Sequence, residues 1–459
     1  MKKYFIPMMF LFAVAAGMSV TSCDDKKDAE TKYTAEQQQN KLDATGEAFI
    51  QELDLANWQS TVDLAVPGIM VLEEMEFDEE YEPEIETRTY DIDNAKKICH
   101  RTYQIDMTRI KGHFTVDDDM IATPVEGDFN DFQLSFTADE HAYVVDVKFT
   151  NSKKNVLMDT YEDTTSGYYD EDNEWQNFEE RYALDSKTFL VLPEKLEAYF
   201  TVDGSKSFSL VGTLTYDGPD DLSEMPDFKT LSVKVGFALN AGGYSMSLDQ
   251  LSYNKGAAKE VFALKRNKKL LLEITSSATG LGLAEEEEVV GVKSPEDGTP
   301  EVDGGYEGYD EEDSALETLT MIQCEKAELA IDVLGQVQVK GYIKYNALIE
   351  KYLDMPAIES QEAAAAWLAT LKPYYDLSLY YDHGNSPQAT IVPAVVDQKG
   401  IVPSIVFADG TSYAVEEFFT EDNFTKTVAA LQALVTSVNE YFDSFSAGED
   451  SVVTEEQPK

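Results

Sequence analysis

The chain has 459 residues, of which 87 are acidic and 36 basic, and its formal net charge at pH 7 is −51. So acidic a surface repels phosphate groups, which excludes a nucleic-acid partner. With 43% hydrophobic and 11% aromatic residues, the composition is that of a folded protein, long enough for two or three domains or one long array.

The N-terminus predicts a lipoprotein signal peptide over residues 1–22. Two lysines precede an apolar run, residues 4–18, that is too short to span a bilayer. The small residues Val20-Thr21-Ser22 then lead directly into Cys23. This pattern resembles a bacterial lipobox, which implies cleavage before Cys23 and acylation of that residue, palmitate being one such acyl chain. Each buried CH₂ contributes about 0.8 kcal/mol, so several chains on one residue make a stable anchor.

An acidic cluster, Asp24-Asp25-Lys26-Lys27-Asp28, follows the cysteine. Together with Cys23 it resembles the export signal of surface lipoproteins of the Bacteroidota, which implies a body tethered to the outer face of the outer membrane. Two alternatives stay open. Asp24 also resembles the enterobacterial signal for retention in the inner membrane, and the cysteine could be incidental to an ordinary signal peptide. No apolar run after Cys23 reaches 18 residues, so membrane attachment rests on the lipid alone.

The first elements after a charged tether over 23–33 are a helix and an acidic loop. Thr34 and Gln37 have the spacing of a capping box, which predicts an amphipathic helix to about Trp58. Nine acids within residues 73–86 indicate an exposed loop.

The middle of the chain is strand-like. Residues 133–137 and 143–149 alternate apolar and polar side chains on either side of a turn at 138–141, which predicts a hairpin. Residues 159–180 and 285–313 are acidic and indicate loops, and the second, rich in glycine, is the best candidate for a linker.

Helices return late in the chain. Ser360 is expected to cap an alanine-rich helix over 361–372 that Pro373 ends. Thr420 or Asp422 is expected to cap the last helix. Its apolar stripe predicts packing against a core, with a self-associating helix as the alternative. The stripe consists of Phe424, Val428, Leu431, Val435, Val438, Phe442 and Phe445.

These patterns predict an α+β fold that is predominantly antiparallel β-sheet, with an N-terminal helix and a long C-terminal helix. The expected parts are the signal peptide (1–22), the tether (23–33), a helix with a first β-rich unit (34–200), a second β-rich unit (201–284), the linker (285–313) and a third α+β unit (314–459).

Three segments share the pattern apolar-x-Gly-x-apolar-x-apolar and suggest that the three units are related. They are residues 110–116, 210–216 and 339–345, and a hairpin is expected downstream of each, at 182–189, 262–270 and 406–413. The glycine falls on the apolar face, where a bulge, a bend or a close neighbour would require it. The alternative is that unrelated strands simply look alike.

Cys99 and Cys324 occupy similar places ahead of the first and third of these segments. Equivalent positions in separate units are usually far apart, so two buried free thiols are expected rather than a disulfide.

No catalytic motif is present. None of the four histidines lies three or four residues from another, and Cys99 and His100 point to opposite faces of a strand. Nucleophile-elbow, metalloprotease, phosphate-loop and Cys-x-x-Cys motifs are absent from the sequence. We expect no enzyme, with an acid/base hydrolase that uses paired carboxylates as the alternative.

One acidic segment resembles the start of a calcium loop and makes Asp170, Asp172 and Glu174 candidate ligands. It departs from the EF-hand pattern, because Trp175 replaces the turn glycine and Arg181 replaces the bidentate glutamate. A solvated acidic loop is the alternative, and no other cofactor is expected.

Two further features suggest surface chemistry. Asp-Ser/Thr followed by a methyl-bearing residue resembles the O-glycosylation acceptor of the Bacteroidota, and it occurs at Thr164, Ser314 and Ser451. Paired aromatics could stack on sugar rings, or place one ring inward and one outward with no ligand. These aromatics are Tyr168-Tyr169, Trp175, Tyr374-Tyr375 and Tyr380-Tyr381.

The sequence therefore predicts a lipid-anchored surface protein with a non-catalytic binding or scaffolding role, whose partner is a glycan or an envelope protein. The alternative is a carrier that encloses an apolar ligand within a curved β-sheet shell.

Overall fold

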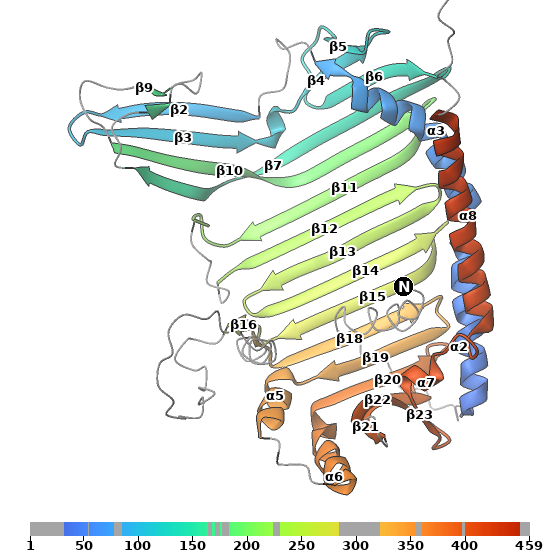
Figure 1. The fold of residues 1–459 in the computed structure, drawn as a ribbon. Coiled ribbons are helices and arrows are strands. Elements are labelled where there is room, and N and C mark those ends of the chain that lie inside the picture. The colour runs from blue at the N-terminus through green and yellow to red at the C-terminus, as the bar shows by residue number, and fades with distance from the viewer. Residues whose placement is uncertain are drawn as a thin grey trace, which may run out of the picture. The chain divides into compact units, whose positions relative to one another are not determined.

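A computed structural model of the chain describes residues 32–53, 55–77, 85–163, 168–169, 175–176, 183–223, 230–283, 322–354, 356, 360–396 and 400–449. Strands make up 53% and helices 26% of the structure. The expected class is confirmed, since the fold is β-rich α+β with a mostly antiparallel sheet, N-terminal helices and a C-terminal helix (Figure 1).

The helices are α2 (Ala35–Glu52), α3 (Leu55–Glu74), α5 (Tyr345–Leu353), α6 (Gln361–Leu371), α7 (Val415–Phe418) and α8 (Thr425–Glu449), with the 3₁₀ turns η2 (Met107–Arg109) and η3 (Lys372–Tyr374). The strands of the first half are β1 (Glu76–Phe77), β2 (Glu86–Asp93), β3 (Ile98–Asp106), β4 (Gly112–Val116), β5 (Ile121–Pro124), β6 (Phe132–Ala138), β7 (His141–Asp163), β8 (Tyr168–Tyr169), β9 (Trp175–Gln176), β10 (Ala183–Val202) and β11 (Ser205–Asp217). Those of the second half are β12 (Ser232–Ala241), β13 (Tyr244–Asn254), β14 (Ala257–Arg266), β15 (Lys269–Thr279), β16 (Gly282–Leu283), β17 (Ile322–Gln323), β18 (Lys326–Val333), β19 (Val337–Ile343), β20 (Tyr375–Tyr381), β21 (Ala389–Val396), β22 (Gly400–Phe407) and β23 (Ser412–Ala414).

The chain divides into two compact units, each assembled from separate stretches of sequence. Unit 1 comprises Met1–Phe49, Asn254–Val261 and Leu272–Val428, and unit 2 comprises Ile50–Tyr253, Phe262–Leu271 and Ala429–Lys459. The β10–β11 hairpin spans the boundary expected between residues 200 and 201. The expected linker over 285–313 lies outside the described residues.

Strand β10 organises the sheet of unit 2. One edge pairs with β7 along almost its whole length. The other edge pairs in parallel with β3 from Ala183 to Val191, and then antiparallel with β11 from Lys195 onward. Pro193 lies at the change of partner. Because proline has no N–H to donate, it is tolerated at such an interruption of the ladder.

Helix α3 closes a compact core at one end of unit 2. Its Val71 packs with Phe114, Leu134, Phe136 and other apolar residues of β4 to β7. The expected hairpin over 133–149 is present as β6 and β7, which pair from Phe132 through to the turn at Asp139–Glu140. Helix α3 itself was not expected. The sequence predicted one helix that ends near Trp58, whereas α3 extends to Glu74 and so overlaps the start of the predicted acidic loop.

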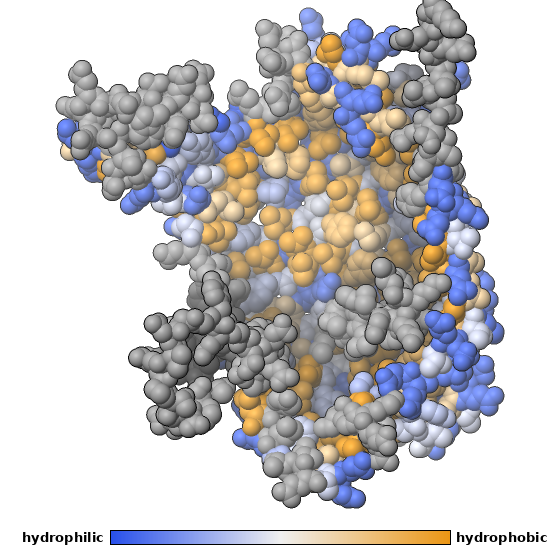
Figure 2. Space-filling model, in the orientation of Figure 1, coloured by the Kyte–Doolittle hydropathy of each residue, from blue (hydrophilic) through white to orange (hydrophobic). Residues whose placement is uncertain are grey.

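The strands beyond this core are only half covered. Among the described residues, neither β11 nor β12 contains a buried side chain, and all of their residues are at least partly exposed. Figure 2 shows apolar side chains gathered on the face of the unit 2 strands that is turned toward the viewer.

Unit 1 is an antiparallel meander. The part of β15 from Leu272 onward pairs with β18, and β18 to β23 follow in order. The last hairpin, β22–β23, overlaps the expected range 406–413 and turns at Asp409-Gly410, with Gly410 at φ +91°.

The first helix is fixed to this meander by a buried polar side chain. Gln38 is fully buried, and its Nε2 donates to the carbonyl of Gln388 at 2.8 Å and to that of Tyr33 at 3.2 Å. Its Oε1 accepts from the Tyr381 hydroxyl at 3.2 Å. Leu42, one turn further on, enters the same apolar core. The helix therefore sits in one register on the sheet, because a shift would leave buried polar groups unpaired.

Two of the expected helix starts are confirmed. Gln37 N donates to Thr34 Oγ1 at 3.3 Å while Thr34 N donates to Gln37 Oε1 at 2.9 Å, which is the reciprocal capping box. Ser360 Oγ accepts from Ala363 N at 3.2 Å and caps α6.

The start of α8 is capped across space rather than only locally. Asp43, on α2, accepts through its carboxylate from the backbone of Lys426 at 3.3 Å and of Thr427 at 2.9 Å. The Thr427 hydroxyl also donates to this carboxylate at 2.9 Å. Thr420, one of the two expected caps, accepts from Asn423 N at 3.3 Å, just before the helix begins.

Among the described side chains of the apolar stripe of α8, Phe424 alone is fully buried, while Val428, Leu431 and Val438 are half-buried. Phe424 is 2% exposed and lies in the unit 1 core, whereas Val435 is 49% exposed. The prediction that the whole stripe packs into a core is therefore wrong at Val435, and the side chains of Phe442 and Phe445 lie outside the described ones.

The three glycine-containing segments are all strands or strand starts, but their glycines are required for different reasons. Gly112 has φ +123°, which favours glycine. A Cβ on Gly212 would meet only ordinary contact, 3.6 Å from Leu196. A Cβ on Gly341 would lie 2.2 Å from the carbonyl oxygen of Asp376.

The hairpin expected at 182–189 is wrong, because those residues lie within the single strand β10 from Ala183 on. The hairpins at 262–270 and 406–413 correspond to consecutive strands, β14 to β15 and β22 to β23. The shared sequence pattern therefore indicates a strand, but it does not indicate that the three glycines have equivalent surroundings.

Replacing Asp43 tests the long-range cap. Asp43→Ala removes the acceptor for two backbone N–H groups and one hydroxyl, and should lower the free energy of unfolding by about 1–2 kcal/mol. Asp43→Asn keeps an acceptor oxygen and should recover most of the loss. Chemical denaturation followed by circular dichroism measures both, and an Ala variant as stable as the wild type would contradict the cap.

Two glycine substitutions give a matched test of the segments. Gly341→Ala forces a Cβ against the backbone of β20 and should destabilise the protein by more than 1 kcal/mol, as the backbone must move. Gly212→Ala meets only an ordinary van der Waals contact with Leu196 and should be neutral or stabilise by up to about 1 kcal/mol. Equal thermal stability of the two variants would mean that the three glycines are equivalent after all.

Candidate ligand pocket in unit 1

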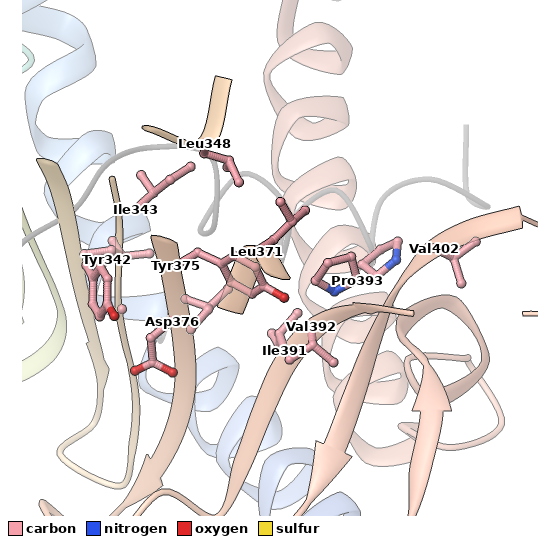
Figure 3. Close-up of a pocket in the computed structure, with 14 residues that line it drawn as sticks. Tyr342, Ile343, Leu348, Leu371, Tyr375, Asp376, Ile391, Val392, Pro393 and Val402 are labelled. Carbon is pink, nitrogen blue, oxygen red and sulfur yellow. The ribbon is translucent and has the colours of Figure 1, made fainter. Parts of the chain in front are cut away.

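An apolar pocket of about 420 Å³ lies between the unit 1 meander and its two short helices. Strands β18 to β22 form one wall, and α5 and α6 contribute Leu348 and Leu371 (Figure 3). Its lining residues are Leu329, Gly341, Tyr342, Ile343, Leu348, Leu371, Tyr375, Asp376, Leu377, Ile391, Val392, Pro393, Val402 and Pro403.

The pocket continues the apolar face on which α2 packs. Val337 on β19 and Leu379 on β20 belong to the core under α2. Side chains alternate along a strand, so Gly341 and Leu377 lie on this same face, further along the two strands. Gly341 faces Leu377 in register and presents no side chain, which leaves space above the sheet and lets β20 approach closely.

Two prolines shape the part of the wall that β21 and β22 form. Pro393 on β21 and Pro403 on β22 face each other directly in the ladder. Neither has an N–H to donate, so they must form a non-hydrogen-bonded pair, in which the side chains stand closest. Their rigid rings therefore give the pocket an apolar wall that rotamer changes cannot close.

Few polar groups reach the pocket. Asp376 is its one carboxylate, and the Ser378 hydroxyl donates to that carboxylate at 2.9 Å. Burial raises the pKa of Tyr375, which keeps its hydroxyl neutral. A site with this lining suits an apolar ligand and provides no pair of carboxylates for acid/base hydrolysis.

A second hollow lies in unit 2. It measures about 560 Å³ and is lined by α3, β4, β6, β7 and the β4–β5 turn, with Asp117, Asp118 and several hydroxyl groups among its residues. The Asp117 carboxylate already accepts from the backbone of Asp119 and Ile121 in the turn, both at 3.0 Å. Its mixed lining does not select one class of ligand.

The residues that the sequence proposed for lipidation, glycosylation or calcium binding all lie outside the described part of the chain. These are Cys23, the candidate glycosylation sites Thr164, Ser314 and Ser451, and the candidate calcium ligands Asp170, Asp172 and Glu174. Within the described ranges, no group of three or more His, Cys, Asp or Glu side chains could hold a metal ion.

The tyrosine pairs of unit 1 do not form an exposed groove. Tyr381 is 5% exposed and packs under α2, where its ring meets that of Tyr33 edge-on, 5.5 Å between centroids. Tyr375 lines the apolar pocket, and Tyr380 is half-buried. The side chains of Tyr168, Tyr169 and Trp175 lie outside the described ones.

The two cysteines are free and buried, as the sequence predicted. Burial raises the pKa of both thiols. Cys99 is 1% exposed while the neighbouring His100 is partly exposed, in agreement with their opposite faces on β3. Neither thiol is therefore placed as a nucleophile.

Every histidine faces an aspartate, which sequence spacing did not reveal. The pairs are His100–Asp185 at 2.8 Å, His113–Asp131 at 3.0 Å, His141–Asp203 at 2.7 Å and His383–Asp332 at 3.5 Å. The pairs join separate strands or turns, so no local motif could have identified them. None of these residues lines the unit 1 pocket, so the contacts are not part of that site.

No protein-family model, no curated protein and no solved structure matches this chain. Among the described helices, none is long and apolar enough to cross a membrane.

Proposed function

We propose that this protein is a lipid-anchored, non-catalytic protein of the cell envelope that binds an apolar ligand in the unit 1 pocket. The observation that carries the proposal is the pocket of about 420 Å³ whose lining is almost wholly aliphatic, aromatic and proline. Its size falls in the range of about 300–1,000 Å³ that is usual for small-ligand sites.

The chemistry of the lining favours an apolar ligand over a glycan. A sugar needs several hydrogen-bonding side chains around a stacked ring, whereas this pocket has one carboxylate, already engaged by Ser378, and two tyrosines. An aliphatic chain or a fused apolar ring needs only desolvated contact, worth about 25 cal/mol per Å² of apolar surface buried. The lining therefore favours the apolar ligand of a carrier over the sugar ligand of a lectin.

The cellular setting comes from the sequence. The lipobox-like Cys23 and the acidic cluster behind it support an acylated N-terminus at the outer membrane, with the body facing outward. The charge of −51 suits a solvated, cation-rich exterior. Glycans on Thr164, Ser314 or Ser451 and calcium at Asp170, Asp172 and Glu174 belong to the same proposal as surface features.

Filling the pocket tests the ligand site. N-phenyl-1-naphthylamine, a neutral fluorophore that brightens in apolar surroundings, should bind the wild type saturably. Val402→Trp places an indole in the pocket and should weaken binding about tenfold, which corresponds to about 1.4 kcal/mol.

The control is Val125→Trp, the same substitution at a residue of unit 2 that is 44% exposed. It should leave the affinity unchanged, and thermal unfolding shows whether both variants fold. Equal affinity of the wild type and a folded Val402→Trp protein would place the fluorophore elsewhere and remove the proposed site.

Replacing Cys23 tests the anchor. In the cell that makes the protein, a clickable fatty acid should label the wild type, and Cys23→Ala should lose both the label and the membrane association, because no other acyl acceptor is proposed. Protease added to intact cells should digest the wild-type body. A label that persists on the variant would refute acylation at Cys23, and a protected wild-type body would refute the outward orientation.

A further inference from the structure

Helix α3 is depleted of charge in a chain that is otherwise rich in it. Between Leu55 and Leu72 the only ionisable side chain is Asp63. At the chain's average of 27% charged residues, these 18 positions would carry about five. A surface helix normally places charges on the side that faces water, so their absence needs a physical reason.

The helix has two apolar sides, of which only one is buried. Ala65, Gly68 and Val71 face the unit 2 core, and the space beside Gly68 is filled by the rings of Tyr143 and Phe200. The Tyr143 hydroxyl donates to the carbonyl of Leu64 at 2.9 Å, which fixes the rotation of the helix about its axis.

The other side carries Val62, Val66 and Ile69, at the i, i+4, i+7 spacing of a second stripe, with Met70 beside it. Ile69 is 42% and Met70 54% exposed, while the two valines are half-buried. Trp58, near the start of the helix, is 38% exposed. We call this side the outer face of α3.

The one charge between Leu55 and Leu72 is already paired. The Tyr441 hydroxyl of α8 donates to Asp63 Oδ1 at 2.8 Å, and burial together with this carboxylate raises the pKa of Tyr441 to about 12. The hydrogen bond therefore persists at neutral pH. The neighbouring part of α8, residues 429–439, has no ionisable side chain, so the outer face of α3 borders a second uncharged surface.

We infer that the outer face of α3 lies in the interface of a neutral lipid bilayer and forms a second, non-covalent membrane contact. An apolar helix side with an exposed Trp suits contact at the lipid head-group level, where Trp is enriched. No described helix could cross the membrane, so α3 rests on it.

Charge decides between a bilayer and a second copy of the chain as the occupant. Two copies that each carry −51 repel each other on approach, whereas a zwitterionic lipid surface has no net charge to oppose the protein. The choice of a bilayer also rests on the proposed acyl chains of Cys23, which hold the chain at the membrane. Helices α2 and α3 are the first described elements after that residue, so a weak contact by α3 acts at high effective concentration.

The experiment uses the full mature chain, acylated and in the Cys23→Ala form, with phosphatidylcholine vesicles whose acyl chains carry bromine. Bromine quenches tryptophan within the bilayer, so Trp58 should lose fluorescence in both forms, and Trp58→Phe should remove the quenched component. Quenching of the unacylated chain tests α3 by itself, whereas fatty-acid labelling tests the anchor, so the two failures are distinguishable.

A matched pair of variants tests the face itself. Ile69→Asp places a charge on the outer face and should weaken vesicle binding of the unacylated chain about tenfold. Ile121→Asp changes the same residue type at the same exposed fraction, 42%, on strand β5 and should have no effect. Absence of Trp58 quenching, or equal losses for the two variants, would overturn the inference. So would a concentration-dependent dimer that Ile69→Asp abolishes, because the face would then bind a second copy.

Discussion

The buried amide of Gln38 is the interaction on which the arrangement of unit 1 depends. It connects α2 to the ends of β20 and β21 through Tyr381 and the carbonyl of Gln388. A buried amide left without these partners would cost about 1–3 kcal/mol, so the helix has one favourable position on the sheet. One turn later Asp43 caps α8, and the register fixed by Gln38 therefore also sets where the last helix begins.

The pocket follows from the same register. The apolar face of β19 and β20 is covered by α2 over Val337 and Leu379, and it continues beyond the helix at Gly341 and Leu377. There the covering elements are α5 and α6, which leave a space rather than a packed core. Gly341 adds no side chain to fill the space, and the rings of Pro393 and Pro403 are rigid. The pocket therefore depends on residues whose side chains cannot change rotamer to close it.

The acidic side chains of the chain contrast with two features that carry almost no charge. Eighty-seven acidic residues keep the surface solvated, and the four histidines each face an aspartate. Against this background the uncharged outer face of α3 and the apolar lining of the unit 1 pocket are exceptions. The first is an apolar surface and the second an apolar cavity. Both are consistent with a protein that works beside a membrane.

The sequence by itself determined the elements whose signals are local. The capping box at Thr34, the N-cap at Ser360, the turn at Asp409-Gly410 and the hairpin over 133–149 follow from neighbouring residues, because turn and cap energetics involve only a few positions along the chain. The free thiols and the β-rich class were also predicted correctly. The hairpin expected at 182–189 failed, because pairing with β3 and β7 extends β10 straight through those residues.

Only the tertiary structure decided what depends on distant partners. The cap of α8 by Asp43 joins positions more than 380 apart, and each histidine meets its aspartate from another strand or turn. The pocket needs five strands and two helices at once, and the second helix, α3, owes its buried side to Tyr143 and Phe200. A periodic pattern states that a residue is apolar, but which apolar side is covered is set by the neighbours that folding brings to it.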